Sequence, residues 1–419
     1  EPLREVYGPM RPIQVVIAVH IEPMGPGPDS RRKREDYARR RAELLWLHET
    51  AKRFGAKLSV QANGEYVEYC RELGHQEDFL SLLRDGNDVG THAHPVYREG
   101  PHQWVRVPPR AAHSGMAERI WADNVAAVET VIGREANTVM CAAVPQSGTP
   151  EHTQLMKQFA FSIQGGGPNE EAYAFWGHDV WNPWRPGLGP TGVEDLGQRD
   201  FILVPHLPQI GRTNPHGPLR IPQDRRLASL QRQFLQEYLN WRALERQGGS
   251  PRVWTFGCAT HPEQNPQHRD DIVRFLEWLN ANFIGRRSAG GNVIAEYASF
   301  GEVAKGFADF ERQAPDRSSL SMPRARAYPY PLLGLLEPLK KALYVGRIAG
   351  AENEAEAHVL RIGEKQAALA WREMGTALLE VSDVVGAEVE VIAAASGERR
   401  QADGRAVEVS GDPVLIIAR

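Results

Sequence analysis

Residues 13–23 read IQVVIAVHIEP, a run rich in β-branched side chains that ends in a histidine and a glutamate before a proline. Such residues favour strands, and an apolar run that gives way to polar residues is typical of a buried strand at the point where it emerges. His20 and Glu22 are two residues apart, so on a strand their side chains point to the same side. The stretch therefore predicts a buried strand with two polar side chains at its carboxyl end.

Further apolar runs follow along the first two thirds of the chain and alternate with amphipathic helical patterns. This alternation predicts a parallel sheet, closed or nearly closed into a β/α barrel. In such folds chemistry gathers at the carboxyl ends of the strands. We expect the other strands near 57–61, 88–95, 137–143, 161–164, 201–204 and 253–257.

The last part of the chain has a different pattern. Residues 311–345 are rich in proline, arginine and serine, and beyond them only short strands are expected. We predict a catalytic barrel over 1–310, a linker over 311–350 and a small all-β sandwich over 351–419. The predicted fold class is therefore α/β, a distorted β/α barrel with a C-terminal β-sandwich.

Composition and charge exclude some classes of function. The 419 residues carry a net charge of −4, which gives no reason to expect nucleic acid as a partner. No apolar run approaches the roughly 20 residues of a membrane-spanning helix. The three cysteines have no zinc-finger or CxxC spacing and are expected to be buried apolar residues. No signal-peptide pattern opens the chain, and compartment and oligomeric state are left open.

Two histidines at the expected third strand are the first metal candidates. His92 and His94 alternate with Ala93, so both imidazoles would reach one side of the sheet, and zinc favours imidazole nitrogen. Glu22 adds a carboxylate, which gives three ligands with room for water. His20 is either a fourth ligand or a base. A divalent ion is expected as cofactor, and zinc is the expected metal. The alternative is that these side chains are packed or solvated.

Other candidates come from further strand ends and from an aromatic loop. His261 follows the last barrel strand and could act as a general acid, and Asn63 follows the second strand and could point into a cleft. Trp176, Trp181 and Trp184 could stack on sugar rings, or they could pin the loop that carries them.

The order of these strand ends resembles that of the polysaccharide deacetylases, the NodB-like carbohydrate esterases. Their first motif is an acidic pair after an apolar strand, and residues 18–23 resemble its variants with the pattern D-x-E. Residues 89–95 are similar to their glycine-and-histidine motif. His178-Asp179-Val180-Trp181 resembles their fourth motif, and Thr260-His261-Pro262 their last. The resemblance spans residues 12–285. It implies a distorted β/α barrel, a metal-dependent hydrolase and a carbohydrate substrate that loses an acyl group, and it adds Asp179 to the catalytic candidates.

The sequence departs from the family's pattern at three places. The two histidines are two apart instead of four, His20 stands where an aspartate base is expected, and residues 138–143 lack the arginine of the third motif. The metal site is therefore rebuilt, with His20 as a ligand, or the chemistry differs from deacetylation.

Two alternatives stay open. A glycoside hydrolase needs paired carboxylates roughly 5–10 Å apart, for which Glu22, Asp179 and Glu194 are the candidates. The altered motifs also fit a carbohydrate-binding protein that has lost its catalytic activity.

Overall fold

The computed structural model describes most of both predicted units. The described residues are 8–24, 30–101, 103–108, 116–145, 148–166, 182–188, 194–206, 226–262, 266–317, 338–339, 342–351, 355–394 and 396–419. Asp179, Trp176 and Trp181 lie outside them.

The parallel sheet is built around β1 (Ile13–Ile21), which is buried along almost its whole length. One edge of β1 pairs with β9 (Trp254–Thr260). The other edge pairs first with β10 (Ala295–Tyr297) and then with β2 (Leu58–Ala62). Because β1 has a parallel partner on each edge, its carboxyl end lies between those of β9 and β2.

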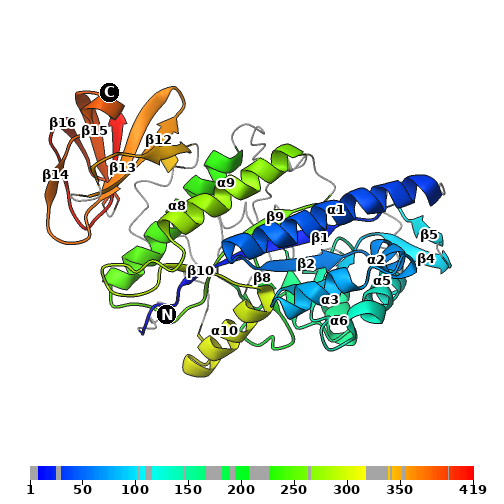
Figure 1. Cartoon of the computed structure of the whole chain (residues 1–419). Helices are drawn as coiled ribbons and strands as arrows, with labels where there is room; N and C mark the ends of the chain where they lie inside the picture. Colours follow the sequence, from blue (N-terminus) through cyan, green and yellow to red (C-terminus); the bar gives the residue numbers. More distant parts are fainter. Residues whose placement is uncertain are drawn as a thin grey trace.

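The sheet continues from β2 through β3, β6, β7 and β8, all parallel, and helices surround it (Figure 1). This arrangement confirms the predicted distorted β/α barrel. The strands are β3 (Asp88–Ala93), β6 (Val139–Ala142), β7 (Ile163–Gly165) and β8 (Ile202–Val204). The helices are α1 (Ser30–Phe54), α2 (Gly64–Glu72), α3 (Glu77–Arg84), α5 (Ala117–Ile132), α6 (Pro150–Gln158), α8 (Arg226–Arg246), α9 (Pro266–Asn282) and α10 (Phe300–Gln313); β4 (Val96–Gly100) and β5 (Gln103–Arg106) form a hairpin after β3.

Side chains along each strand alternate between the barrel interior and the outer layer. On β1, Val16 and Ala18 pack in the interior cluster together with Phe300 and Phe307 of α10. Ile17 and Val19 pack in the outer cluster under the helices. This two-residue period fixes which later residues of a strand face inward.

The barrel does not close through a β8–β9 ladder among the described strands, and the segment 182–186 lies in that gap instead. Trp184 forms an antiparallel bridge with Leu203 of β8. Asn182 donates a hydrogen bond from Nδ2 to the carbonyl of Val253, next to the start of β9, at 2.7 Å. We call this β8–β9 gap with its bridging segment the seam.

The C-terminal part is an antiparallel β domain. Its six-stranded sheet has the order β11-β12-β13-β18-β15-β16, and a two-stranded sheet, β14-β17, accompanies it. The strands are β11 (Ala342–Arg347), β12 (Glu356–Ile362), β13 (Lys365–Trp371), β14 (Ala377–Leu379), β15 (Glu388–Ala393), β16 (Arg399–Asp403), β17 (Val407–Val409) and β18 (Val414–Ala418), with the short helix α12 (Ser382–Val385) between β14 and β15. The β domain begins with β11, inside the range that the sequence assigned to the linker.

The large sheet of the β domain packs on α8 of the barrel (Figure 1). Trp371 of β13 packs against Tyr238 of α8, with ring centroids 6.0 Å apart and the ring planes tilted by 59°. Arg242, also on α8 and almost fully buried, donates to Glu373 at 2.9 Å and to the carbonyl of Gly411 at 2.7 Å. The face of the sheet toward α8 is therefore covered by the barrel, while β14, β17 and α12 contribute to a separate core.

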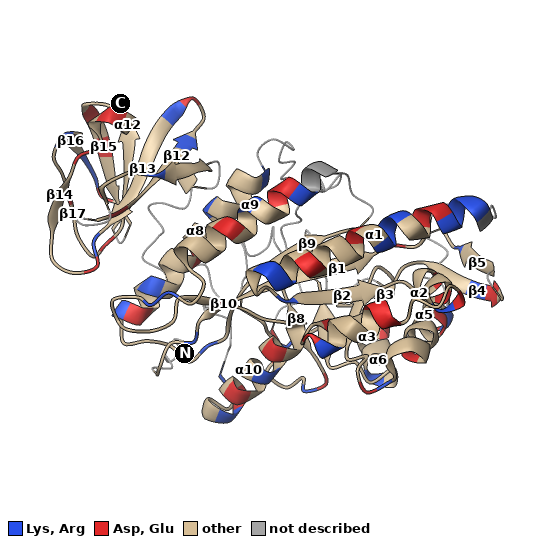
Figure 2. Cartoon of the chain, in the orientation of Figure 1, with Lys and Arg blue, Asp and Glu red and all other residues tan. Residues whose placement is uncertain are grey.

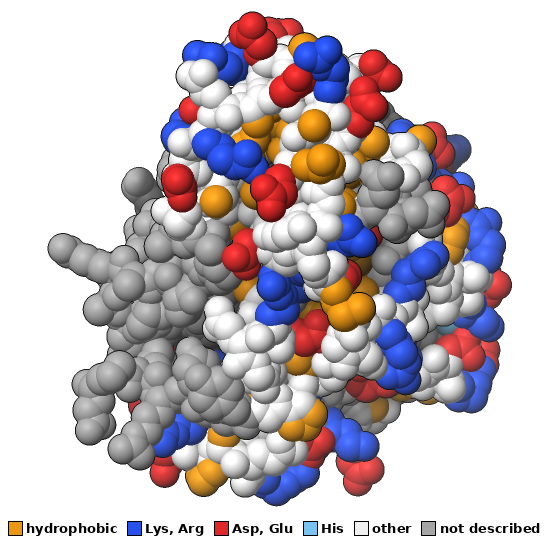
Figure 3. Space-filling model, turned by 90° about the vertical axis from the view of Figure 1, so that its left-hand side faces the viewer, with side chains coloured by type: hydrophobic (Ala, Val, Ile, Leu, Met, Phe, Trp, Pro, Cys, Tyr) orange, Lys and Arg blue, Asp and Glu red, His pale blue; other side chains and the backbone are white. Residues whose placement is uncertain are grey.

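The surface mixes charges of both signs. Acidic and basic residues alternate along α1 (Figure 2), where Arg41 pairs with Asp78 and Arg31 with Glu35. The face that Figure 3 shows carries both signs beside scattered apolar side chains. Among the described helices, none combines the length and apolar character that a membrane crossing requires.

Candidate functional site

The candidate residues follow the inward-facing positions of the strands. Val16 and Ala18 face the interior, so the next residues in phase on β1 are His20 and Glu22. Val139 of β6 faces the same interior, and Cys141 follows it in phase. The other candidates continue this two-residue period at the carboxyl ends of their strands: Gly90, His92 and His94 at β3, Ile202, Val204 and His206 at β8, and Gly257, Ala259 and His261 at β9.

The Glu22 carboxylate lies among three imidazoles. Its Oε2 is 2.8 Å from Nε2 of His94, and its Oε1 is 3.5 Å from Nε2 of both His92 and His261. Four residues from three strand ends are thus brought to one point at the barrel mouth. We call Glu22, His92 and His94 the primary cluster.

The backbone around His92 holds that ring in place. Its Nδ1 lies 3.1 Å from the carbonyl of Cys141, the register partner of His92 on β6, so Nε2 is the nitrogen turned toward Glu22. A Cβ on Gly90 would lie 2.3 Å from the carbonyl of Val139, so only glycine lets β3 approach β6 this closely. Such partners fix ring orientation in metal sites.

The electrostatics of the primary cluster favour a cation. Burial by itself would raise the pKa of Glu22, but the imidazoles of His261, His92 and His94 beside the carboxylate outweigh that effect and hold its pKa far below the usual range. Burial by itself would lower the pKa of His92. The side chains of Cys141 and Glu22 outweigh this effect and raise the pKa of His92 to about 10. The carboxylate is therefore anionic, and a bound cation would displace the protons that surround it.

The donor atoms of the primary cluster fit a metal ion. One ligand atom from each of Glu22, His92 and His94 lies within 4.8 Å of the other two. Zinc–nitrogen and zinc–oxygen bonds of about 2.0–2.2 Å allow two ligands of one ion to be up to about 4 Å apart, so a small closure of the side chains suffices. Nε2 of His92 is buried and has no hydrogen-bond partner within the described part of the chain. Two histidines and one carboxylate are a donor set of catalytic zinc sites that leaves one position open.

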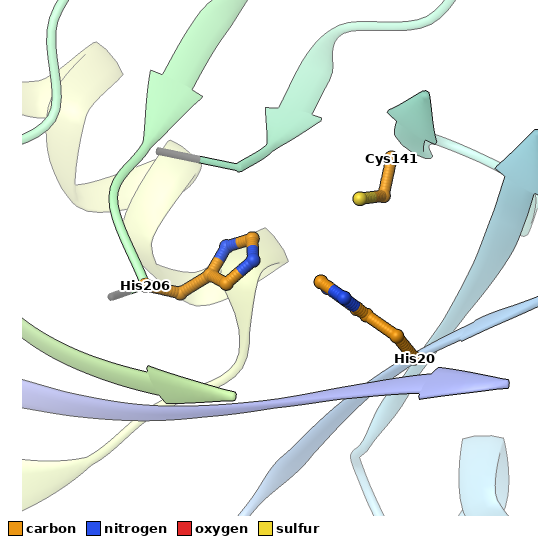
Figure 4. Close-up of side chains that lie close together, drawn as sticks. All are labelled: His20, Cys141 and His206. Atoms are coloured by element: carbon orange, nitrogen blue, oxygen red, sulfur yellow. The ribbon is translucent and has the colours of Figure 1, made fainter. Parts of the chain in front are cut away.

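His20 lies between the primary cluster and a second group of side chains, with its ring centroid 4.9 Å from that of His92 and 5.3 Å from that of His261. His20 pairs with Gln61 of β2, and Gln61 pairs with Gly90 of β3. Gly90 comes two residues before His92, so His20 lies deeper in the barrel than His92. A ligand atom of His20 lies within 4.8 Å of those of Cys141 and His206 (Figure 4). Burial, with the neighbouring His206 and His92, lowers the pKa of His20, and burial lowers the pKa of His206 to about 3. We call His20, Cys141 and His206 the inner cluster.

Two of the residues predicted to bind substrate have structural contacts instead. Asn63 is fully buried and caps α2, and its Nδ2 donates to the carbonyl of His92 at 3.1 Å and to Oδ1 of Asn124 at 2.9 Å. Trp184 is also fully buried, at the seam. Neither side chain is open to a cleft, so Asn63 positions the backbone of His92 and Trp184 fills the core. The corresponding predictions for Trp176, Trp181 and Asp179 lie outside the described residues.

A cavity of about 380 Å³ opens beside the primary cluster. Its lining includes His94, Arg106 and a group of prolines and valines: Pro23, Pro95, Pro108, Val96 and Val107. The volume is in the range of small-molecule pockets. A ligand in this cavity would therefore meet His94 directly.

Sequence reasoning missed two residues of the barrel mouth. Cys141 was expected to be a buried apolar residue like the other two cysteines, and His206, which is 2% exposed, was not among the predicted site residues. The signal that finds both is the phase of their strands, because Cys141 lies two residues after the inward-facing Val139 and His206 two residues after Val204.

Comparisons with known proteins give similarity at the level of solved structures. No family model matches the sequence, and no curated protein matches it. A probable polysaccharide deacetylase from Pseudomonas aeruginosa PAO1 is 12% identical, covers 73% of this chain and 93% of its own, and has a TM-score of 0.46. A putative polysaccharide deacetylase from Mycobacterium smegmatis is 14% identical over 76% of this chain and 100% of its own, with a TM-score of 0.42. The Puue allantoinase is 10% identical over 72% and 91%, with a TM-score of 0.45.

Proposed function

We propose that the chain is a metal-dependent hydrolase that removes acyl groups from a carbohydrate. The observation that carries the proposal is the convergence of Glu22, His92 and His94 on one point beside the cavity, with His261 at the same carboxylate. The resemblance of the strand-end motifs to those of polysaccharide deacetylases supports the carbohydrate and the acyl group as substrate.

Glu22, His92 and His94 would hold the ion. Zinc bound there would supply Lewis-acid chemistry, which polarises a carbonyl and lowers the pKa of water. The carboxylate supplies negative charge, and the carbonyl of Cys141 keeps Nε2 of His92 directed at the ion. His94 lines the cavity, so an acyl carbonyl that enters there reaches the ligand set.

His261 is the proposed proton-transfer residue. Its Nε2 lies 3.5 Å from Oε1 of Glu22, and its ring is almost fully buried at the end of β9. A histidine at this distance from the ligand set can take a proton from the attacking water and return it to the leaving amine or alcohol. We assign this step to His261 and not to His20, because His20 lies in the inner cluster.

The partners of the Glu22 carboxylate bear on the glycosidase alternative. Glycosidic bond cleavage uses two carboxylates that flank the sugar. The Glu22 carboxylate lies beside three imidazoles, which is a surrounding expected for a metal ligand.

Two ligand variants test the metal dependence. We expect Glu22→Gln and His94→Ala to lose the zinc ion of the primary cluster and to reduce acetate release from acetylated glycan oligomers by about 100-fold or more. His75→Ala is the matched control, because His75 contacts Tyr37 at the outer helices and should leave zinc content and rate unchanged. Full activity in both ligand variants would overturn the proposal.

A third variant separates proton transfer from metal binding. His261→Ala should lower the rate by about 10²–10⁴-fold, the usual range for a general acid or base, and keep zinc at the primary cluster. An unchanged rate with unchanged zinc content would remove His261 from the mechanism.

A further inference from the structure

The inner cluster contains a donor set that the proposed hydrolysis does not use. Its three side chains come from different strands: His20 from β1, Cys141 from β6 and His206 from the residues after β8 (Figure 4). All three are buried, with exposed fractions of 6%, 9% and 2%. In Figure 4 they point toward a common space inside the barrel.

Two ring nitrogens of the inner cluster lack hydrogen bonds. Nε2 of His20 and Nδ1 of His206 are buried and have no hydrogen-bond partner among the residues that the structure describes. A buried polar atom without a partner costs free energy, and a metal ion coordinated by both nitrogens would remove that cost. Gln61, the register partner of His20, adds a buried amide that is unpartnered within the same described ranges.

The thiol of Cys141 distinguishes this set from the primary cluster. Cys141 is a free cysteine, and one ligand atom from each of the three residues lies within 4.8 Å of the other two. Thiolate and imidazole together select thiophilic ions such as zinc, whereas the primary cluster offers a carboxylate. On binding, the thiol gives up its proton to solvent and its sulfur bonds to the ion.

We propose that His20, Cys141 and His206 form a second metal site, which takes a thiophilic ion such as zinc. The ion would tie β1 and β6 to the residue that follows β8, at the seam where the described strands have no β8–β9 ladder. Because its ligands are more deeply buried than Glu22 and His94, this site is structural, while the primary cluster stays accessible from the cavity.

Cobalt substitution tests the second site without relying on activity. We expect metal-free protein to bind two equivalents of Co²⁺, with the near-ultraviolet charge-transfer absorption that a cobalt–thiolate bond produces. Cys141→Ser should bind one equivalent and lose that absorption. Cys258→Ser is the matched control, since this buried cysteine packs in the outer layer of the barrel, and it should keep both equivalents and the band.

Glu22→Gln separates this inference from the proposed function. It should lose the equivalent at the primary cluster and keep the charge-transfer band. A single equivalent without a sulfur band in the wild-type protein, or a band that persists in Cys141→Ser, would overturn the second site and leave the primary cluster unaffected.

X-ray absorption on zinc-loaded wild-type protein gives a measurement that needs no variant. The account predicts a zinc–sulfur shell near 2.3 Å, with about one sulfur for every two zinc ions. A spectrum with nitrogen and oxygen neighbours alone would contradict the second site even if Cys141→Ser failed to fold.

Discussion

His152 differs from the histidines of the barrel mouth because aromatic rings surround it. Its ring centroid lies 5.7 Å from that of Trp121 and 6.1 Å from that of Phe201. Both ring nitrogens are buried and have no hydrogen-bond partner in the described part of the chain. Burial therefore lowers the pKa of His152 to about 4.

This pKa predicts a loss of stability in mild acid. In the unfolded chain a histidine has a pKa of about 6.5. Between that pH and about pH 4, the unfolded state therefore binds a proton at His152 and the folded state does not. The difference removes about 2 kcal/mol of unfolding free energy between pH 7 and pH 5. Urea unfolding at both pH values should show this loss in the wild type and a smaller one in His152→Leu. An equal loss in the two proteins would exclude His152 as the cause.

The roles of some single residues could be predicted from the sequence, and those of others could not. Strand alternation was enough to predict that His92, His94 and Glu22 converge, because each continues an inward-facing series. The contacts of Asn63 depend on Asn124 of α5, which is 61 residues away, and no local pattern specifies that pair. Likewise, the burial of Trp184 follows from its pairing with Leu203 of β8, which a glycine- and proline-rich loop does not reveal.

At the scale of elements, the seam depends on a close contact between β9 and the residues after β8. A Cβ on Gly257 of β9 would lie 2.3 Å from Cα of His206 and from the carbonyl oxygen of Pro205. Backbone atoms cannot yield as a flexible side chain can, so the two segments would have to separate. His206 would then move away from the inner cluster.

Gly257→Ala should therefore lower the free energy of unfolding by about 1–3 kcal/mol, the usual cost of overpacking. Gly346→Ala on β11 is the control, because no atom lies within 4 Å of its added Cβ. Chemical denaturation of both variants measures the difference. Equal stability of the two variants would show that the seam tolerates separation.

Element boundaries were predicted where a local pattern marks them and missed where pairing decides them. The apolar run 13–19 was enough to predict β1, because a strand with apolar side chains on both faces must be buried on both faces of a sheet. β11 was assigned to the linker, because its place in the sheet comes from pairing with β12 and not from its own residues. The short strand β8 was recognised, but the segment that bridges it to β9 was not.

At the scale of the whole molecule, the β domain and the barrel share an apolar core. Trp371 and Leu369 of the β domain belong to the same buried cluster as Tyr238 and Trp241 of α8. Arg242 adds hydrogen bonds to Glu373 and Gly411 across the same contact. The β domain therefore supports α8, which in turn contacts β9, the strand that directly precedes His261.

The central claim is that acyl hydrolysis depends on an ion held by Glu22, His92 and His94. The most direct measurement follows acetate release from acetylated glycan oligomers while zinc is added back to the metal-free protein. The account predicts that the metal-free wild type is inactive, that zinc restores its rate, and that zinc restores nothing in Glu22→Gln. Acetate release by the metal-free protein at the rate of the zinc-loaded protein would contradict the claim.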